Sequence, residues 1–282
     1  MNRVKIFTDS TADLSSELVE KYDIEVVPLY VLIGENSYLD GIEMTTEELY
    51  RQINERQIMP KTAAPSTGDF YEKFAPWVQA GYDVVYVGLS SHLSGTFQAA
   101  RLAAEEFAEG RVWVLDSLNL STGIGLLVLK AAELARQGKS AAEISSSISE
   151  LIPRVRVSFV IDTLQYLHMG GRCTSIQLLA SNVLKIRPQI IVKDGGMITG
   201  AKFRGKRASC LEQFYKEVVG DGSKINRERA FVTHSGCSEA ELLDYTNRLK
   251  GIGVSEVLTS QAGTVISSHC GPGTIGIIYI ED

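Results

Sequence analysis

The chain has 282 residues, of which 44% are hydrophobic and 22% are charged, and its formal net charge is −6. This length fits two domains of ordinary size with packed cores, and the composition is not that of a disordered chain. The acidic balance argues against a general nucleic-acid-binding protein, which needs a basic surface.

The first residues enter a strand-like segment directly, without an apolar signal region or a small-residue cleavage site. No uninterrupted apolar run reaches transmembrane length, because Lys130 and Glu133 interrupt the longest one. The cysteines form no CxxC pair, so we expect free thiols. They are Cys173, Cys210, Cys237 and Cys270. These features predict a cytoplasmic protein.

The first half of the chain alternates strand and helix signals. Apolar runs predict strands at 4–8, 24–33, 82–89 and 111–117. Helical patterns, several opened by capping residues, stand at 14–22, 45–53, 66–79, 97–107 and 121–138. Pro28 predicts an edge position or a bend in the second strand. The succession predicts a doubly wound, mostly parallel α/β sheet domain over residues 1–155.

In sheets of this kind, ligands lie beyond the carboxyl ends of the strands. That rule favours three loops as parts of a binding site. They follow Thr8, surround residues 62–66 and follow Leu89.

The second half has a different pattern. Two strand-like runs within 187–205 flank Asp194-Gly195-Gly196, a strong hairpin signal. Further strands are expected at 158–162, 229–235 and 274–281, with helices at 210–219 and 239–251. Residues 163–172 break helical periodicity at Gly170-Gly171. We therefore expect a second, α+β domain with antiparallel strands over residues 156–282, and a ligand at the interdomain cleft.

Two loops of the first domain could hold an anion. The loop 62–70 reads either as a proline-containing loop with a helix cap or as one whose Thr62 hydroxyl points into the cleft. In 90–100, hydroxyls and a glycine precede a helix, whose free N–H groups and positive dipole suit a phosphate or a carboxylate equally. This loop is neither a Walker loop nor a GxSxG nucleophile elbow.

Two segments of the second domain could complete a site. Arg172 follows a double glycine and could clamp an anion or stabilise the domain junction. His269 lies in a segment rich in Ser, Gly and Pro, which we expect to be a loop. Its ring could donate to a carboxylate or serve as a structural hydrogen bonder.

Other chemistries find no support in the sequence. The histidines show no metal-ligand spacing, so no metal site is expected, and adjacency alone does not make His269 and Cys270 a catalytic dyad. A basic run with only Asp194 against it reads as a solvated face, or as a surface for an acidic partner or anionic lipid. Its members are Lys185, Arg187, Lys193, Lys202, Arg204, Lys206 and Arg207.

Five segments in this order resemble the DegV family over essentially the whole chain. They are FTDSTADL at 7–14, TAAPSTGDF at 62–70, SSHLSGTFQAA at 90–100, LQYLHMGGR at 164–172 and HCGPGTIGI at 269–277. The resemblance implies a two-domain α/β fold with one long-chain fatty acid buried at the junction. It implies a lipid-binding subunit with no catalytic machinery and no cofactor, whose separate ATP-dependent kinase subunit converts the bound carboxylate to an acyl phosphate for phospholipid synthesis.

The resemblance also assigns roles to residues. Thr62, Ser94 and His269 would bind the fatty-acid carboxylate, and Arg172 would lie near the head group or the kinase-facing surface. Further head-group or partner contacts would come from Ser66, Gly95 and Thr96. The family's loop commonly reads Thr-Ser-Gln-Pro-Ser, whereas Ala63 and Ala64 stand here in place of the middle pair. This departure concerns fine positioning or partner choice, because Thr62, Pro65 and Ser66 are retained.

Elementary energetics predicts a division of labour in such a carrier. Burying about fourteen methylenes at roughly 0.8 kcal/mol each gives on the order of 11 kcal/mol before the costs of association. Hydrogen bonds to the carboxylate largely offset its desolvation. We therefore expect the tail to set the affinity and the hydroxyls to set which end faces outward.

The sequence leaves two other functions open. One is a stand-alone serine-dependent lipid hydrolase or acyltransferase that uses Ser94 with His269. The other is a small-anion or nucleotide-binding module, which rests on fold analogy alone. In the carrier hypothesis, the partners are a long-chain fatty acid, a kinase subunit and, transiently, a membrane surface, with no nucleic acid.

Overall fold

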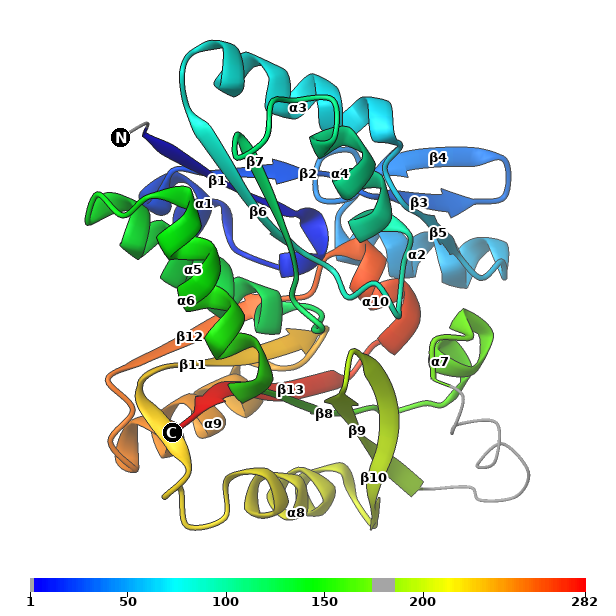
Figure 1. Cartoon of the computed structure of the whole chain (residues 1–282). Coiled ribbons are helices and arrows are strands. Elements are labelled where there is room, and N and C mark those ends of the chain that lie inside the picture. The colour runs from blue at the N-terminus through cyan, green and yellow to red at the C-terminus, as the bar shows by residue number, and fades with distance from the viewer. Residues whose placement is uncertain (1–2, 174–185) are drawn as a thin grey trace.

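The computed structural model describes residues 3–173 and 186–282, which form three sheets (Figure 1). The strand orders are β2-β1-β6-β7, β10-β9-β8-β13-β11-β12 and β4-β3-β5. The first sheet is wholly parallel, and the second is antiparallel except where β11 and β12 pair. The predicted combination of a parallel α/β part and a mostly antiparallel second part is confirmed.

The parallel sheet is covered by helices on both faces. Its strands are β1 (Val4–Asp9), β2 (Ile24–Val27), β6 (Asp83–Gly88) and β7 (Val112–Asp116). Phe7 and Tyr86 belong to one apolar cluster with α3 (Thr67–Gln79) and α4 (Thr96–Ala104). Alternate positions such as Ile6 belong to another, with α1 (Ser16–Tyr22), α5 (Thr122–Arg136) and α6 (Ala141–Leu151). Alternation along buried strands thus produces the doubly wound arrangement.

The single strand expected at residues 24–33 is wrong. Pro28 has no N–H for a ladder, and the chain leaves the parallel sheet there. It continues as β3 (Tyr30–Ile33) of a small antiparallel sheet with β4 (Asn36–Leu39) and β5 (Lys61–Ala63). Helix α2 (Thr46–Arg56) connects β4 to β5. This sheet matters for the site because Thr62 lies at the centre of β5.

The larger sheet takes its strands from residues 155–281. They are β8 (Val155–Val160), β9 (Ile186–Lys193), β10 (Gly196–Arg204), β11 (Ile225–Ser235), β12 (Glu256–Gln261) and β13 (Thr274–Glu281). Helices α8 (Arg207–Val219) and α9 (Glu239–Gly251) match the predicted ones. The predicted β9–β10 hairpin is present, and Asp194 and Gly195 both adopt positive φ at its turn, as a two-residue type I′ turn requires.

Two short helices replace segments that were expected to be irregular. Residues 165–170 form α7 (Gln165–Gly170), which ends at Gly171 in the left-handed conformation. Residues 264–270, expected to be partly loop around His269, form α10 (Thr264–Cys270). Both helices are shorter than the two turns needed for a periodic pattern, so hydrophobic periodicity could not reveal them.

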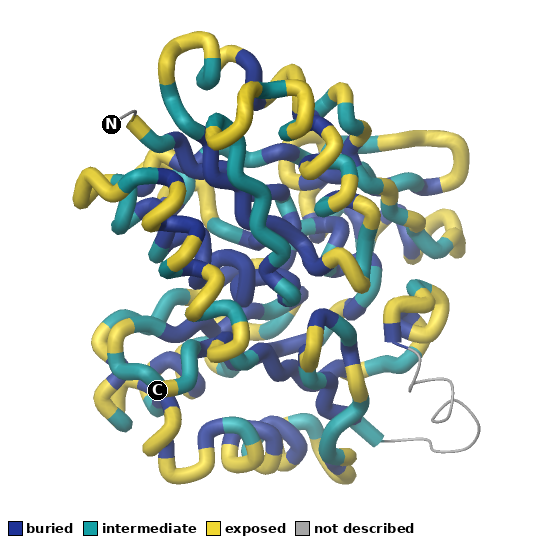
Figure 2. The backbone as a smooth tube through the Cα atoms, viewed as in Figure 1, coloured by how far each residue is buried: buried dark blue, intermediate teal, exposed yellow. Residues whose placement is uncertain are grey.

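Buried residues run from the parallel sheet through α5 to β8 and β13 (Figure 2), and one apolar cluster includes residues from all of these elements. It includes Val85, Leu127, Val157 and Ile278. Helix α10, although late in sequence, packs on β3, β5 and α2. These contacts tie together the parts of the chain on either side of residue 155. The domain boundary at that residue stays a prediction. None of the helices in the described ranges is both long and apolar enough to cross a membrane.

Candidate functional site

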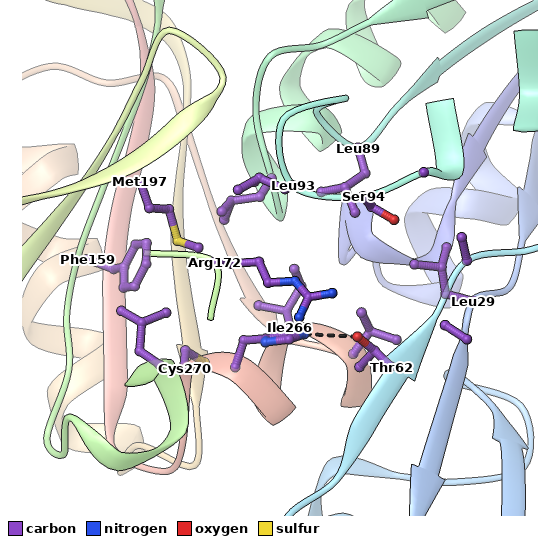
Figure 3. A pocket seen from close by; sticks show the side chains of 17 residues that line it. Leu29, Thr62, Leu89, Leu93, Ser94, Phe159, Arg172, Met197, Ile266 and Cys270 are labelled. Carbon is purple, nitrogen blue, oxygen red and sulfur yellow. Dashed lines mark hydrogen bonds between the residues drawn. The ribbon is translucent and has the colours of Figure 1, made fainter. Parts of the chain in front are cut away.

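A cavity of about 190 Å³ lies where the loops after the parallel strands face the larger sheet (Figure 3). Most of its lining is apolar. This apolar lining comprises Leu29, Ala63, Ala64, Leu89, Leu93, Leu120, Phe159, Leu167, Met197, Val265, Ile266 and Cys270. The polar or charged side chains are those of Thr62, Ser94, Arg172 and His269. The exposed part of the lining consists of Ala63, Gly95 and Arg172, and we call it the mouth.

Thr62 and His269 are joined directly across the cavity wall. Thr62 Oγ1 lies 3.0 Å from His269 Nε2, although the residues are 207 positions apart (dashed line in Figure 3). Strand β5 fixes Thr62 by pairing it with Val31 of β3, and His269 stands in the last turn of α10. Two elements that are distant in sequence are thus linked by one hydrogen bond.

His269 is held in its neutral form. Burial, assisted by the positive charge of Arg172, lowers the pKa of the imidazole to about 4. Its Nδ1 is buried without a hydrogen-bond partner and faces Gly170, where a Cβ would come within 2.3 Å of it. A buried N–H without a partner is rarer than an under-satisfied acceptor, so we infer that the proton is on Nε2. His269 then donates to Thr62, which leaves the Thr62 hydroxyl hydrogen free for a ligand.

Two buried carboxylates hold the start of α10. Asp13 Oδ1 accepts from the Gly263 N–H at 2.8 Å, and Asp40 Oδ1 accepts from the N–H and hydroxyl of Thr264 at 2.7 Å each. Burial raises the pKa of Asp13 well above its usual value, against the opposing effect of the Ser121 hydroxyl that donates to it. These acids fix the helix that presents His269. No local sequence pattern links Asp13 or Asp40 to this helix, because both lie more than 200 positions before it.

Ser94 lies on the opposite wall, just before α4. Its Oγ is 2.8 Å from Thr96 Oγ1 and accepts a bond of 3.3 Å from the Thr96 N–H. Thr96 is fully buried and is not among the lining residues, and its two hydrogen bonds hold Ser94. Gly95 occupies the N-cap position of α4, makes no side-chain cap and lines the mouth.

Arg172 extends from the end of α7 into the space between Ser94 and Thr62 (Figure 3). Its Nη1 donates to the Gly170 carbonyl at 2.6 Å, which fixes the direction of the exposed side chain. A planar guanidinium placed beside two hydroxyls suits a carboxylate or a phosphate.

Ser66 has a local role. It caps α3, accepting from the Asp69 N–H at 3.1 Å while Asp69 accepts from the Ser66 N–H at 2.7 Å. Ser66 is exposed and is absent from the cavity lining, so the cap accounts for it.

The basic run is less uniform than its sequence suggests. Asp162, at the end of β8, pairs with both Arg187 and Arg207, and Arg207 also pairs with Glu241. The expectation that only Asp194 opposes this run is therefore wrong, because opposing carboxylates come from distant positions. Lys185 lies outside the described residues.

The geometry does not assemble the serine-dependent dyad. His269 Nε2 faces Thr62, and Ser94 is engaged with Thr96. Cys210, Cys237 and Cys270 form no disulfide. Within residues 3–173 and 186–282, no group of three His, Cys, Asp or Glu is arranged to hold a metal ion.

A family model described as "Uncharacterised protein, DegV family" matches residues 3–282. The chain belongs to the DegV family. A relative from Thermotoga maritima called "Fatty acid-binding protein" is 35% identical over 97% of this chain and 96% of its own length. Two solved structures are similar along nearly their whole length.

The first, from Thermus thermophilus and described as showing fatty acid binding, has a TM-score of 0.91 at 32% identity and covers 99% of this chain and all of its own. The second, a stearic acid-binding protein from Eubacterium ventriosum, has a TM-score of 0.84 at 28% identity. The match covers 99% of this chain and 98% of that protein's chain. The DegV resemblance read from the five segments is thereby confirmed.

Proposed function

We propose that this DegV protein binds one long-chain fatty acid in the cavity, with the carboxylate at Thr62 and Ser94. The observation that carries the proposal is the polarity of the cavity, whose hydroxyls and guanidinium gather near the mouth while the buried walls are apolar. An anion with a long hydrocarbon tail is the ligand that satisfies both ends. The fatty acids bound by solved relatives support this choice.

The head group would be held by donors only. With the imidazole neutral and donating to Thr62, the Thr62 and Ser94 hydroxyls can both donate to carboxylate oxygens, and Arg172 supplies charge. Each hydrogen bond to a charged group contributes about 1.5–3 kcal/mol. His269 would thus act mainly by orienting Thr62, in addition to any direct contact with the ligand.

We further propose that the protein presents the carboxylate to a separate ATP-dependent kinase subunit and performs no catalysis itself. Arg172 is exposed and lies beside the hydroxyls, so a partner could reach the carboxylate without unfolding the carrier. Acyl phosphate keeps an anionic head that the same donors would hold. A cytoplasmic location with transient membrane contact fits a carrier that collects fatty acids from lipid.

Native mass spectrometry of the purified protein, with lipid extraction of the same sample, tests the binding step. We expect a one-to-one adduct with the mass of a fatty acid of fourteen to eighteen carbons. A protein that is purified without bound fatty acid and does not bind added palmitate or oleate would contradict the proposal.

The presentation step has a separate test. Loaded protein is mixed with ATP and the fatty acid kinase subunit of the same organism, and acyl phosphate is trapped with hydroxylamine. We expect acyl hydroxamate only when all three components are present. Product formation from the loaded protein and ATP alone would show that the carrier is itself the enzyme.

A further inference from the structure

A second, smaller cavity of about 30 Å³ lies behind the first. It is bounded by the inner faces of β8, β11 and β13 and by the start of α5. Leu120, Phe159, Ile266 and Cys270 line both cavities, so the two cavities share a wall. The inner cavity therefore continues the outer one away from the mouth.

The hydroxyls on the wall of the inner cavity are hydrogen-bonded within the protein, and His234 is the remaining polar side chain of its lining. Thr233 Oγ1 lies 2.6 Å from Thr122 Oγ1, and Ser235 Oγ lies 2.7 Å from Ser267 Oγ. Thr274 donates to the Cys270 carbonyl at 2.9 Å, and Ser121 donates to Asp13. At the mouth, by contrast, Thr62 retains a hydroxyl hydrogen for a ligand.

The inner wall is also tightly set. A Cβ at Gly123 would come within 2.5 Å of Val157 Cγ2, so the glycine lets β8 and α5 approach and fixes Val157 at the end of the cavity. Ile278, on the neighbouring strand β13, completes this end and is 2% exposed. Neither side chain can retreat without repacking the core.

We propose that the inner cavity receives the methyl end of the bound acyl chain, and that Val157 and Ile278 set the longest chain that fits. The inference rests on the proposed fatty-acid function and extends it to substrate selection. A chain whose carboxylate is at Thr62 and whose tail follows the shared wall at Phe159 and Ile266 ends against these two side chains.

The test is competition among saturated acids of fourteen to twenty carbons, presented together to purified protein and quantified after extraction. Ile278→Ala lengthens the cavity, and we expect the retained mixture to shift toward longer chains by about fourfold for each additional methylene accommodated. Ile277→Ala is the matched control. Ile277 is the adjacent, fully buried residue of β13 and packs in the cluster on the other side of the sheet.

We expect the Ile277→Ala protein to keep the wild-type preference, and Ile278→Val to give a smaller shift in the direction of Ile278→Ala should the alanine variant fail to fold. Equal chain preferences in wild type and both Ile278 variants would overturn the inference while leaving fatty-acid binding intact. Absence of fatty acid from every protein would instead overturn the proposed function, so the two failures are distinguishable.

Discussion

The mouth of the first cavity and the wall of the inner cavity both carry hydroxyl side chains, but these side chains differ in their hydrogen-bond partners. At the mouth, Thr62 and Ser94 are supported by one neighbour each, His269 and Thr96, and keep capacity to bind a ligand. At the inner end, Thr233 and its neighbours bond to one another, and the surface left over is apolar. Hydroxyls alone therefore do not mark a polar site, because their partners decide what remains for a ligand.

This contrast predicts different consequences for substitutions at the two ends. Substitutions at the apolar wall should change the free energy of unfolding and the binding of the acyl tail, because packing there is part of the core. Changes at the mouth should affect the carboxylate and leave the fold largely intact.

The largest effect is expected for Phe159→Ala. Phe159 is 7% exposed and lines both cavities, so truncation leaves a void between the two parts of the protein. We expect the free energy of unfolding to fall by about 3–5 kcal/mol. Urea denaturation of lipid-free protein measures it, with Leu243→Ala at an exposed position of α9 as control. A loss below about 1 kcal/mol would mean that this wall is not part of the core.

The next effect is a pH dependence of the free energy of unfolding, which we expect from His269 in the first cavity. The pKa of His269 is lowered from 6.5 to about 4 by burial and by Arg172, so the unfolded chain takes up a proton before the folded protein does. Above pH 6.5 His269 therefore costs the folded protein nothing. As the pH falls from 6.5 to 4, protonation of this residue in the unfolded chain lowers the free energy of unfolding by up to about 3 kcal/mol.

Urea denaturation between pH 7 and pH 4 tests this effect in wild type and in His269→Gln. We expect the variant to lose less stability over that interval, because glutamine does not titrate. Parallel curves for the two proteins would show that His269 is already accessible to protons in the folded state.

A smaller effect is expected for Thr62→Val, which removes the hydroxyl and keeps the shape. One lost hydrogen bond to a charged carboxylate corresponds to about ten- to hundredfold weaker binding of palmitate. Methyl palmitate, which has no charged head, should lose much less. Calorimetric titration of both ligands measures the difference, and equal losses would remove Thr62 from the head-group site.

Ser66→Ala is the control for that experiment, because Ser66 lies four residues from Thr62 but caps α3. Loss of the cap should cost about 1 kcal/mol of stability and leave palmitate affinity unchanged. A large loss of affinity would restore Ser66 to the head-group site.

Local signals in the sequence predicted much of the fold. The continuous apolar run at 82–89 identified β6, and Asp194-Gly195 identified the hairpin, because burial and backbone conformation act there on adjacent residues. Helix α10 was missed because its seven residues are stabilised by Asp13 and Asp40, which are distant in sequence. The small sheet containing Thr62 was missed because residues 24–33 were expected to form one strand, with Pro28 at an edge position or a bend.

The site was only partly predictable. The family resemblance named Thr62, Ser94, His269 and Arg172, and all four side chains line one cavity. The apolar wall carried no signal of its own, since Phe159 and Ile266 look like ordinary core residues in sequence. The roles of Thr96 and Ser66 as supporting and capping residues depend on hydrogen bonds that only the three-dimensional structure displays.

The most direct measurement of the central claim is a crystal structure with 16-bromohexadecanoic acid, in which anomalous scattering locates the bromine at the end of the chain. We expect a bromine peak beside Val157 and Ile278 and the carboxylate between Thr62 and Ser94. A bromine peak at the mouth beside Arg172, with the carboxylate in the inner cavity, would contradict it.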